Sequence, residues 1–230
     1  MQSTRVPAKP SDLAPFIDHT LLKADACTAD IEKLCEEAVA HSFKAVCVNP
    51  VFVKLARQKL GSSGVLVASV IGFPLGAHSS AVKAEETRQA VADGAAEIDM
   101  VIRIDFAREA RWKELESDIR SVVQAAGSAR VKVILETGLL DKASIVEACK
   151  ASERAGAAFV KTATGFLGRG ATVEDIETMR KSVSEKIEIK ASGGVKTFAQ
   201  AIAMIEAGAT RIGTSSGVAL VTGTAAGSGY

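Results

Sequence analysis

The stretch Ala155-Gly156-Ala157-Ala158-Phe159-Val160-Lys161-Thr162 joins two segments whose apolar residues recur at different periods. Before Gly156, the apolar positions of residues 145–149 recur every three or four residues, which is typical of an amphipathic helix. After it, residues 158–162 form a short apolar run, as expected of a parallel strand buried on both faces. Because glycine readily adopts the left-handed backbone that ends a helix, this stretch predicts a helix that turns directly into a strand.

The same glycine junction occurs at Gly94-Ala95 and Gly208-Ala209, and helical periodicity also covers residues 31–39 and 198–205. Short apolar runs predict eight strands, at residues 16–20, 44–48, 65–71, 97–101, 131–136, 158–162, 187–191 and 210–214. Their alternation with helices, without a linker, favours a single α/β domain, a closed TIM (β/α)8 barrel. An open doubly wound sheet is disfavoured because no G-x-G-x-x-G motif follows an early strand. We expect the barrel to span residues 1–222 and a flexible Gly/Ser-rich tail to follow at 223–230.

The balance of charge limits the kinds of partner this chain can bind. Its 230 residues include 28 Lys+Arg and 27 Asp+Glu, which gives a formal net charge of +1. Nucleic acids and anionic membranes are held by an excess of basic residues, so we expect neither as a partner. The uncharged stretches are interrupted by Gly and Ser, so none of them predicts a membrane-spanning helix.

The cysteines and histidines give no sign of a disulfide framework or a metal site. Cys27, Cys35, Cys47 and Cys149 lack paired spacing, and the first ten residues lack the apolar run of a secretory signal. We therefore expect reduced thiols in a cytoplasmic protein, with Cys47 as a small apolar strand residue. The three histidines are scattered, so we expect no catalytic zinc.

Polar side chains occur at the ends of six predicted strands: Thr20, Cys47, Asp99, Glu136, Lys161 and Lys190. In a βα barrel the chemistry is performed at the carboxyl ends of the strands. An ionisable group that closes an apolar strand is costly to bury unless it is paired or functional. Several such groups on one rim therefore form a candidate site.

Lys161 is the candidate nucleophile of this rim. An amine that condenses with a carbonyl must be neutral near pH 7, which requires a pKa far below the usual value of about 10.4. Lys190 closes the next predicted strand, and its ammonium would repel a charge on Lys161 and favour the neutral amine. Asp99 would hold the remaining ammonium and relay a proton. A structural ion-pair network would produce the same pattern, so both interpretations remain open.

Two glycine-rich loops follow the last two predicted strands. The first contains Gly193, Gly194 and Lys196, and the second contains Gly213, Ser215 and Ser216. Barrels frequently bind phosphate at these two loops, where glycines let backbone N–H groups approach the oxygens. The loops therefore predict a site for a small phosphorylated molecule.

Taken together, the motifs resemble those of the deoxyribose-phosphate aldolase family, in the family's order and over residues 12–216. The resemblance is carried by Asp18-His19-Thr20-Leu21-Leu22, Val46-Cys47-Val48-Asn49-Pro50, Gly72-Phe73-Pro74-Leu75-Gly76, Glu97-Ile98-Asp99-Met100-Val101, Glu136-Thr137-Gly138, Val160-Lys161-Thr162-Ala163-Thr164-Gly165-Phe166, Lys190-Ala191-Ser192-Gly193-Gly194 and Gly213-Thr214-Ser215-Ser216.

The resemblance implies a class I aldolase on a TIM barrel that reversibly cleaves 2-deoxyribose 5-phosphate to glyceraldehyde 3-phosphate and acetaldehyde, with no metal and no organic cofactor. It implies that Lys161 forms the Schiff base, Lys190 depresses its pKa, and Asp99 serves in the proton relay. Tyr230 matches a C-terminal tyrosine that assists proton transfer at the enamine carbon. The implied substrate-binding residues are Thr20, Gly165, Gly193, Gly194, Lys196, Gly213, Ser215 and Ser216.

Arg103 departs from the family pattern, which has asparagine there, and we expect it to alter only the rim of the site. Two alternatives to the aldolase remain: a sugar-phosphate isomerase or epimerase with Asp99 or Glu136 as base, and a barrel that only binds phosphorylated metabolites. The sequence also allows a homo-oligomer, because the helix face at residues 111–120 fits either an interface or a solvated surface.

Overall fold

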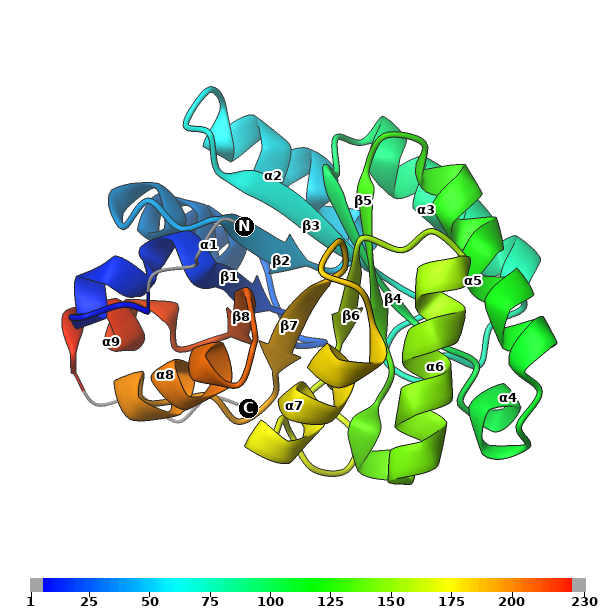
Figure 1. Cartoon of the computed structure of the whole chain (residues 1–230). Coiled ribbons are helices and arrows are strands. Elements are labelled where there is room, and N and C mark those ends of the chain that lie inside the picture. The colour runs from blue at the N-terminus through cyan, green and yellow to red at the C-terminus, as the bar shows by residue number, and fades with distance from the viewer. Residues whose placement is uncertain (1–5, 225–230) are drawn as a thin grey trace.

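The computed structural model describes residues 6–224, in which eight parallel strands form a closed barrel in chain order (Figure 1). Each strand pairs with the next, and β8 pairs with β1, so the predicted TIM barrel is confirmed. The strands are β1 (Ile17–Leu21), β2 (Ala45–Val48), β3 (Leu66–Ile71), β4 (Glu97–Val101), β5 (Arg130–Ile134), β6 (Phe159–Lys161), β7 (Glu188–Ser192) and β8 (Arg211–Thr214).

The helices surround the barrel and bury one face against it (Figure 1). The α-helices are α1 (Thr28–Ala40), α2 (Val53–Leu60), α3 (Ser80–Ala92), α4 (Ile104–Arg108), α5 (Trp112–Ala126), α6 (Lys142–Arg154), α7 (Val173–Ser182), α8 (Phe198–Glu206) and α9 (Gly217–Thr222), with short 3-10 helices at Pro10–Phe16, Pro50–Phe52 and Thr137–Leu139. No helix within residues 6–224 is long and apolar enough to cross a membrane.

The predicted helix-to-strand junctions are present at all three glycines. Gly94, Gly156 and Gly208 follow helices and have φ of +108°, +91° and +117°. A side chain is strained in this left-handed region, so glycine is what allows each chain reversal. Helix α7 begins at a capping box in which Thr172 accepts from the Asp175 N–H at 3.1 Å.

The predicted end of the fifth strand was wrong by two residues. Strand β5 ends at Ile134, although the predicted strand extends through the apolar Leu135 to Glu136. Glu136 has φ +55° and ψ +59°, a left-handed conformation that cannot continue a strand. At the other end of the chain, α9 ends at Thr222, and residues 225–230 lie outside the described residues. The flexible tail therefore stays a prediction.

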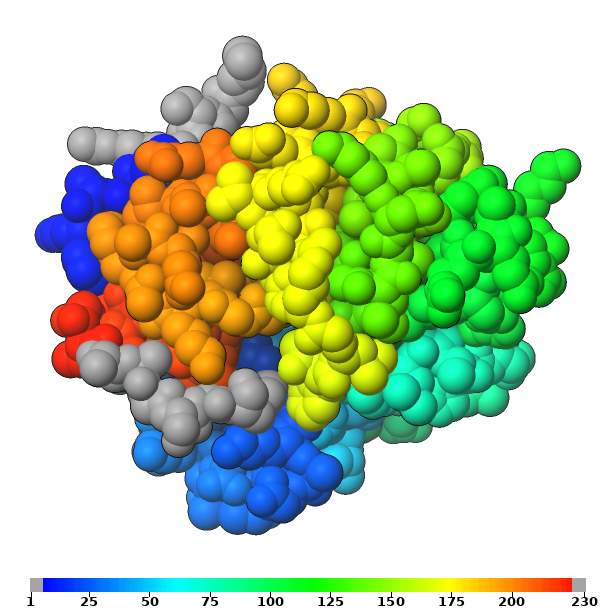
Figure 2. Space-filling model, turned by 90° about the horizontal axis from the view of Figure 1, so that it is seen from below, coloured from blue at the N-terminus to red at the C-terminus, as the bar shows by residue number. Residues whose placement is uncertain are grey.

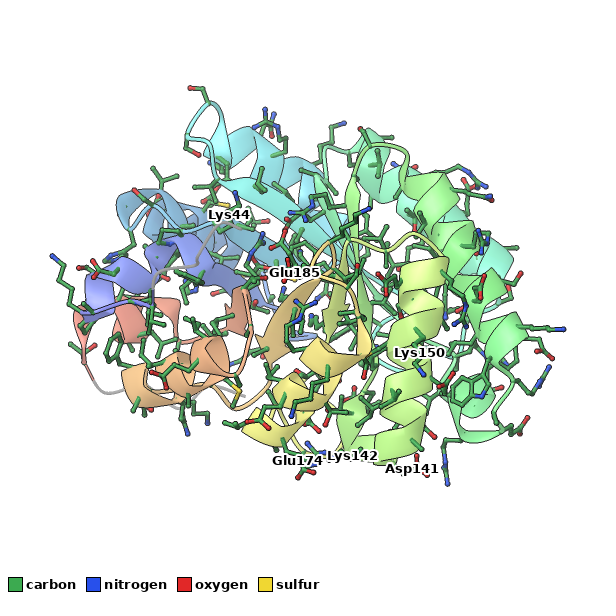
Figure 3. The ribbon with its side chains drawn as sticks, viewed as in Figure 1. Lys44, Asp141, Lys142, Lys150, Glu174 and Glu185 are labelled. Atoms are coloured by element: carbon green, nitrogen blue, oxygen red, sulfur yellow. The ribbon has the colours of Figure 1, made fainter. Side chains whose placement is uncertain are left out.

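The two ends of the barrel can be distinguished in Figure 3. Lys44, which precedes β2, lies in the upper part and Glu185, which precedes β7, lies near the middle, whereas Asp141, Lys142 and Glu174 lie at the bottom. The latter three follow β5 and β6, so the carboxyl ends of the strands face downward. On the outer surface, Lys142 donates to Glu174 at 3.1 Å and joins α6 to α7. Figure 2 views the lower end, where barrel chemistry is expected.

Candidate active site

The barrel interior has an apolar side and a charged side. The apolar side is a cluster of Leu22, Cys47, Ala68 and Val70, with Phe73 packed against it. The charged side consists of seven buried side chains from β1 and β4–β8: Asp18, Glu97, Asp99, Lys132, Lys161, Lys190 and Arg211, hereafter the interior ion cluster. None of them is more than 3% exposed.

Asp99 connects the two lysines that the sequence analysis singled out. Its Oδ2 accepts from the Nζ atoms of Lys161 and Lys190, each at 2.8 Å, and its Oδ1 accepts from Lys132 at 2.7 Å. Lys161 and Lys190 are register partners on the paired strands β6 and β7. The structure thus places both amines on one carboxylate oxygen, in the arrangement expected of adjacent strand ends.

The remaining ion pairs lie around this centre. Lys190 donates to Asp18 at 2.5 Å, and Lys132 lies 2.6 Å from Glu97. Arg211 donates to Asp18 at 2.7 Å and to Glu97 at 2.8 Å. Each buried charge is thus paired at short range, as burial in low dielectric requires.

The charges of the interior ion cluster do not balance if every group is ionised. Four cationic side chains face three carboxylates among the residues that the structure describes. An uncompensated buried ammonium is costly, and neutralisation of the group that is held least firmly relieves that cost. The cluster therefore favours one neutral amine.

Lys161 is the one of these four cationic residues whose pKa is lowered, whereas those of Lys132, Lys190 and Arg211 are raised. Burial lowers the pKa of Lys161, and the Lys190 ammonium lowers it further, so that the opposing attraction of Asp99 does not restore it. Burial acts on Lys190 as well, but the Asp18 and Asp99 carboxylates outweigh it and raise the pKa of Lys190. The pKa values of the two lysines are thus shifted in opposite directions, which favours the neutral amine at Lys161 and the ammonium at Lys190.

Asp99 gives the fold a dependence on acid pH. Burial acts to raise the pKa of Asp99, but the Lys132 and Lys190 ammonium groups and the hydrogen bonds from the adjacent lysines outweigh it and hold this pKa well below its usual value. A folded-state pKa below the unfolded one stabilises the fold above about pH 4, and this stabilisation is lost as pH falls further. We expect the urea midpoint to fall steeply below about pH 4. Denaturation curves at a series of pH values would contradict this if the midpoint stayed constant down to about pH 3.

A small hollow opens at the carboxyl ends of β1, β6, β7 and β8. It has a volume of about 60 Å³ and is lined by residues that include all eight predicted substrate-binding residues, Thr20, Gly165, Gly193, Gly194, Lys196, Gly213, Ser215 and Ser216. In Figure 2, yellow, orange and blue segments border a depression at this end of the barrel. The predicted binding residues thus converge on one place, although they are scattered over the sequence.

Glycine is required where this hollow meets the interior ion cluster. A Cβ atom on Gly213 would lie 2.7 Å from Ser192 Oγ and 2.8 Å from Lys190 Cε. A Cβ atom on Gly170 would lie 2.3 Å from the Gly193 carbonyl oxygen, and Gly193 itself has φ +88°. The absence of side chains at these glycines therefore leaves the hollow open directly beside the Lys190 side chain.

The comparison with known families agrees with this geometry. The profile described as DeoC/LacD family aldolase matches residues 13–223. The chain belongs to this aldolase family. It is 54% identical over 222 residues to the deoxyribose-phosphate aldolase of Carboxydothermus hydrogenoformans, covering 95% of this chain and 97% of the relative. Identity to the deoxyribose-phosphate aldolase of Brevibacillus brevis is 55% over 216 residues, covering 94% and 98%.

A solved structure extends the comparison to the three-dimensional fold. The tetrameric deoxyribose phosphate aldolase from Aeropyrum pernix matches with a TM-score of 0.87 and 34% sequence identity. The match covers 94% of this chain and 92% of that one. Family membership thus rests on similarity over nearly the whole barrel in both sequence and structure.

Three further residues that the sequence analysis discussed for this aldolase are Tyr230, Arg103 and Cys47. Tyr230 lies outside the described residues, so its role stays a prediction. Arg103 donates to Asp105 at 2.8 Å and lies over the Phe106 ring at 4.2 Å, where it begins α4. Cys47 Sγ lies 4.0 Å from Asp99 Oδ2, and burial raises the pKa of this thiol. All four cysteines are free.

Sequence reasoning missed four members of the interior ion cluster: Asp18, Glu97, Lys132 and Arg211. The alternation of side chains along a strand could have identified them, because residues two positions apart face the same side. Glu97 lies two positions before Asp99 on β4 and therefore points to the same side as Asp99. Lys132 lies at the centre of β5 between Val131 and Val133 in the same way. A charged residue at alternate positions of a buried strand points into the barrel.

Proposed function

We propose that the protein is a class I aldolase that reversibly cleaves 2-deoxy-D-ribose 5-phosphate to D-glyceraldehyde 3-phosphate and acetaldehyde through a Schiff base on Lys161. The observation that carries the proposal is the buried Lys161 amine, whose pKa is lowered, on the carboxylate oxygen that also binds the Lys190 ammonium. Such an amine is a nucleophile at neutral pH. The names of the close relatives supply the substrate.

In the proposed mechanism the Nζ of Lys161 attacks the C1 carbonyl of the open-chain sugar. The carbonyl oxygen leaves as water, and the resulting cationic imine draws electrons from the C2–C3 bond. As this bond breaks, the C3 hydroxyl loses its proton and becomes the aldehyde of glyceraldehyde 3-phosphate. We assign Asp99 and Lys190 to the relay of this proton through water, since they contact each other beside Lys161. Hydrolysis of the remaining two-carbon enamine then releases acetaldehyde and restores the amine.

We assign the substrate phosphate to the hollow that Gly193, Gly194 and Gly213 line. Backbone N–H groups at glycines approach an anion closely, and the hydroxyls of Ser215 and Ser216 add donors. Lys196, which is exposed at the edge of the hollow, supplies a positive charge. An overall charge of +1 is compatible with this, because the complementary charge is local.

The decisive experiment is chemical trapping of the Schiff base. Borohydride added with acetaldehyde reduces the imine to a stable ethyl group on the lysine nitrogen, which peptide mapping by mass spectrometry locates. We expect this group on Lys161, because its pKa is lowered and the neutral form of an amine is the nucleophile. An isomerase or a simple binding protein would use no imine, so an unmodified Lys161 would contradict the proposal.

The oligomeric state and the cellular location of the protein are proposed from one relative and from the cysteines. We propose a homo-oligomer, supported by the tetrameric Aeropyrum pernix relative, and a cytoplasmic location, supported by free cysteines among the described residues. We retain Tyr230 as a proton-transfer residue and residues 223–230 as a tail outside the barrel, on the family resemblance alone.

A further inference from the structure

Glu136, the second residue after β5, is a buried carboxyl group that the mechanism above does not use. Its side chain is 0% exposed, and its backbone has φ +55°, which glutamate rarely adopts. The Leu135 N–H donates to the Lys161 carbonyl at 2.9 Å, and the Thr137 N–H donates to the Thr162 carbonyl at 3.0 Å. These two bonds hold Glu136 in a strained conformation beside the end of β6, and such strain is concentrated at functional sites.

The two carboxyl oxygens of Glu136 have different surroundings. Oε2 accepts from Thr164 Oγ1 at 2.6 Å and from the Thr164 N–H at 3.2 Å. Oε1 is buried and has no hydrogen-bond partner within residues 6–224. Leaving a buried oxygen without a partner costs on the order of 1–3 kcal/mol, more if it is charged. Since Thr164 occupies Oε2, a proton on this carboxyl group belongs on Oε1.

The charged groups around Glu136 come from two elements and the loop between them. The Lys161 amine of β6 exerts its field on the Glu136 carboxyl. Thr137, the residue after Glu136, donates from its hydroxyl to Asp175 of α7. The charge of Asp175 is compensated by Arg169 in the β6–α7 loop, which donates to it at 2.9 Å. Burial raises the pKa of Glu136, and the Thr164 hydrogen bonds and Lys161 offset this only in part. Lys161 is thus the charged side chain among these that acts on the Glu136 carboxyl group, and the Leu135 N–H bond to the Lys161 carbonyl places the two residues on neighbouring chain segments.

We propose that Glu136 is a positioning residue that compensates the charge of Lys161, protonated while Lys161 is a neutral amine and ionised when Lys161 becomes a cationic imine. The inference rests on the proposed Schiff-base role of Lys161. The proposed role explains why Glu136 Oε1 is buried and without a hydrogen-bond partner within the described residues. This oxygen carries the proton that is lost when a positive charge forms at Lys161 on β6. Each of the two charges then stabilises the other in a low-dielectric site.

The step is balanced in atoms and charge. The Nζ of Lys161 bonds to the carbonyl carbon, and the carbonyl oxygen leaves as water. This water takes one hydrogen from Nζ and one proton from the site, which the Glu136 carboxyl replaces by releasing its own. The imine nitrogen keeps one hydrogen and a positive charge, and Glu136 keeps a negative charge. The total charge of the site therefore stays constant, and no proton is drawn from solution.

Proton uptake on imine formation tests this directly. Formaldehyde is the suitable probe because it has no second carbon and the reaction stops at the imine. We expect the unmodified protein to form the imine on Lys161 without net proton uptake. Glu136→Gln keeps the size and an acceptor for Thr164 but has no proton to release, so it should take up a proton from the medium for each imine. A pH indicator in weakly buffered solution measures this, with Lys161→Met as the blank for surface lysines.

The pH profile provides a second readout that a merely structural role would not move. In Glu136→Gln, imine formation near neutral pH should slow by about tenfold and should slow further as pH rises, because protons must come from solution. Glu136→Gly tolerates φ +55° and relieves the backbone strain, so it should fold well and show the same uptake. Glu188→Gln makes the same chemical change at a side chain that pairs with Arg130 at the other end of the barrel, and should change neither readout.

The outcomes are distinguishable. If both Glu136 variants form the imine with the proton balance and pH profile of the unmodified protein, the inference is wrong and the Schiff-base mechanism stands. The same holds if the unmodified protein takes up a proton for each imine. If the unmodified protein forms no borohydride-reducible adduct on Lys161, the proposed function is wrong and this inference is wrong with it.

Discussion

Substitution of Lys161 by methionine should abolish cleavage of 2-deoxyribose 5-phosphate, with a loss on the order of a thousandfold or more. Methionine fills a similar volume but has no amine, so no imine can form and the C2–C3 bond has no electron sink. The initial rate of acetaldehyde release measures this loss, and borohydride trapping should give no adduct. Residual activity within tenfold of the unmodified protein would contradict the central role of Lys161.

The same variant should keep its fold, which separates a chemical effect from a structural one. Removal of Lys161 leaves three cationic groups facing three carboxylates in the interior ion cluster, so no buried charge loses its only partner. Asp99 retains Lys132 at 2.7 Å and Lys190 at 2.8 Å. We expect a urea midpoint equal to or above that of the unmodified protein, since a buried polar group is replaced by an apolar one.

The sequence was informative where local patterns determine the structure. The apolar runs and the three glycine junctions were sufficient to predict eight strands, because each depends only on neighbouring residues. The adjacency of Lys161 and Lys190 followed from the pairing of consecutive strands. The two glycine-rich loops that line the hollow were located by their glycines, and at Gly213 the structure leaves no room for a side chain.

The features that were missed depend on closure of the barrel. Asp18 and Arg211 form an ion pair across 193 positions of sequence, and only the pairing of β1 with β8 brings them together. The left-handed turn at Glu136 was hidden because the apolar pattern of β5 continues into it. Its function depends on the unpartnered Oε1 and on Lys161, neither of which is visible in a linear pattern.

Substitution of Lys190 by methionine should inactivate the enzyme at neutral pH for an electrostatic reason. With one cation fewer, the cluster balances only if Lys161 keeps its proton, and the repulsion that lowers the pKa of Lys161 is lost. The pKa of Lys161 therefore rises, and each unit of rise reduces the neutral fraction at pH 7 about tenfold. We expect the rate near pH 7 to fall by roughly a hundredfold or more, with imine formation shifted to alkaline pH.

The pH dependence of this variant separates the two roles assigned to Lys190. If Lys190 only keeps Lys161 neutral, raising the pH should restore both imine formation and cleavage. If it also relays the proton of the C3 hydroxyl, imine formation should recover at high pH while cleavage stays slow, and we expect this second result. Lys142→Met, which breaks an exposed pair with Glu174, is the matched control and should alter neither. An unchanged pH profile in Lys190→Met would mean that burial alone keeps Lys161 neutral, since burial is the larger of the two effects that lower its pKa.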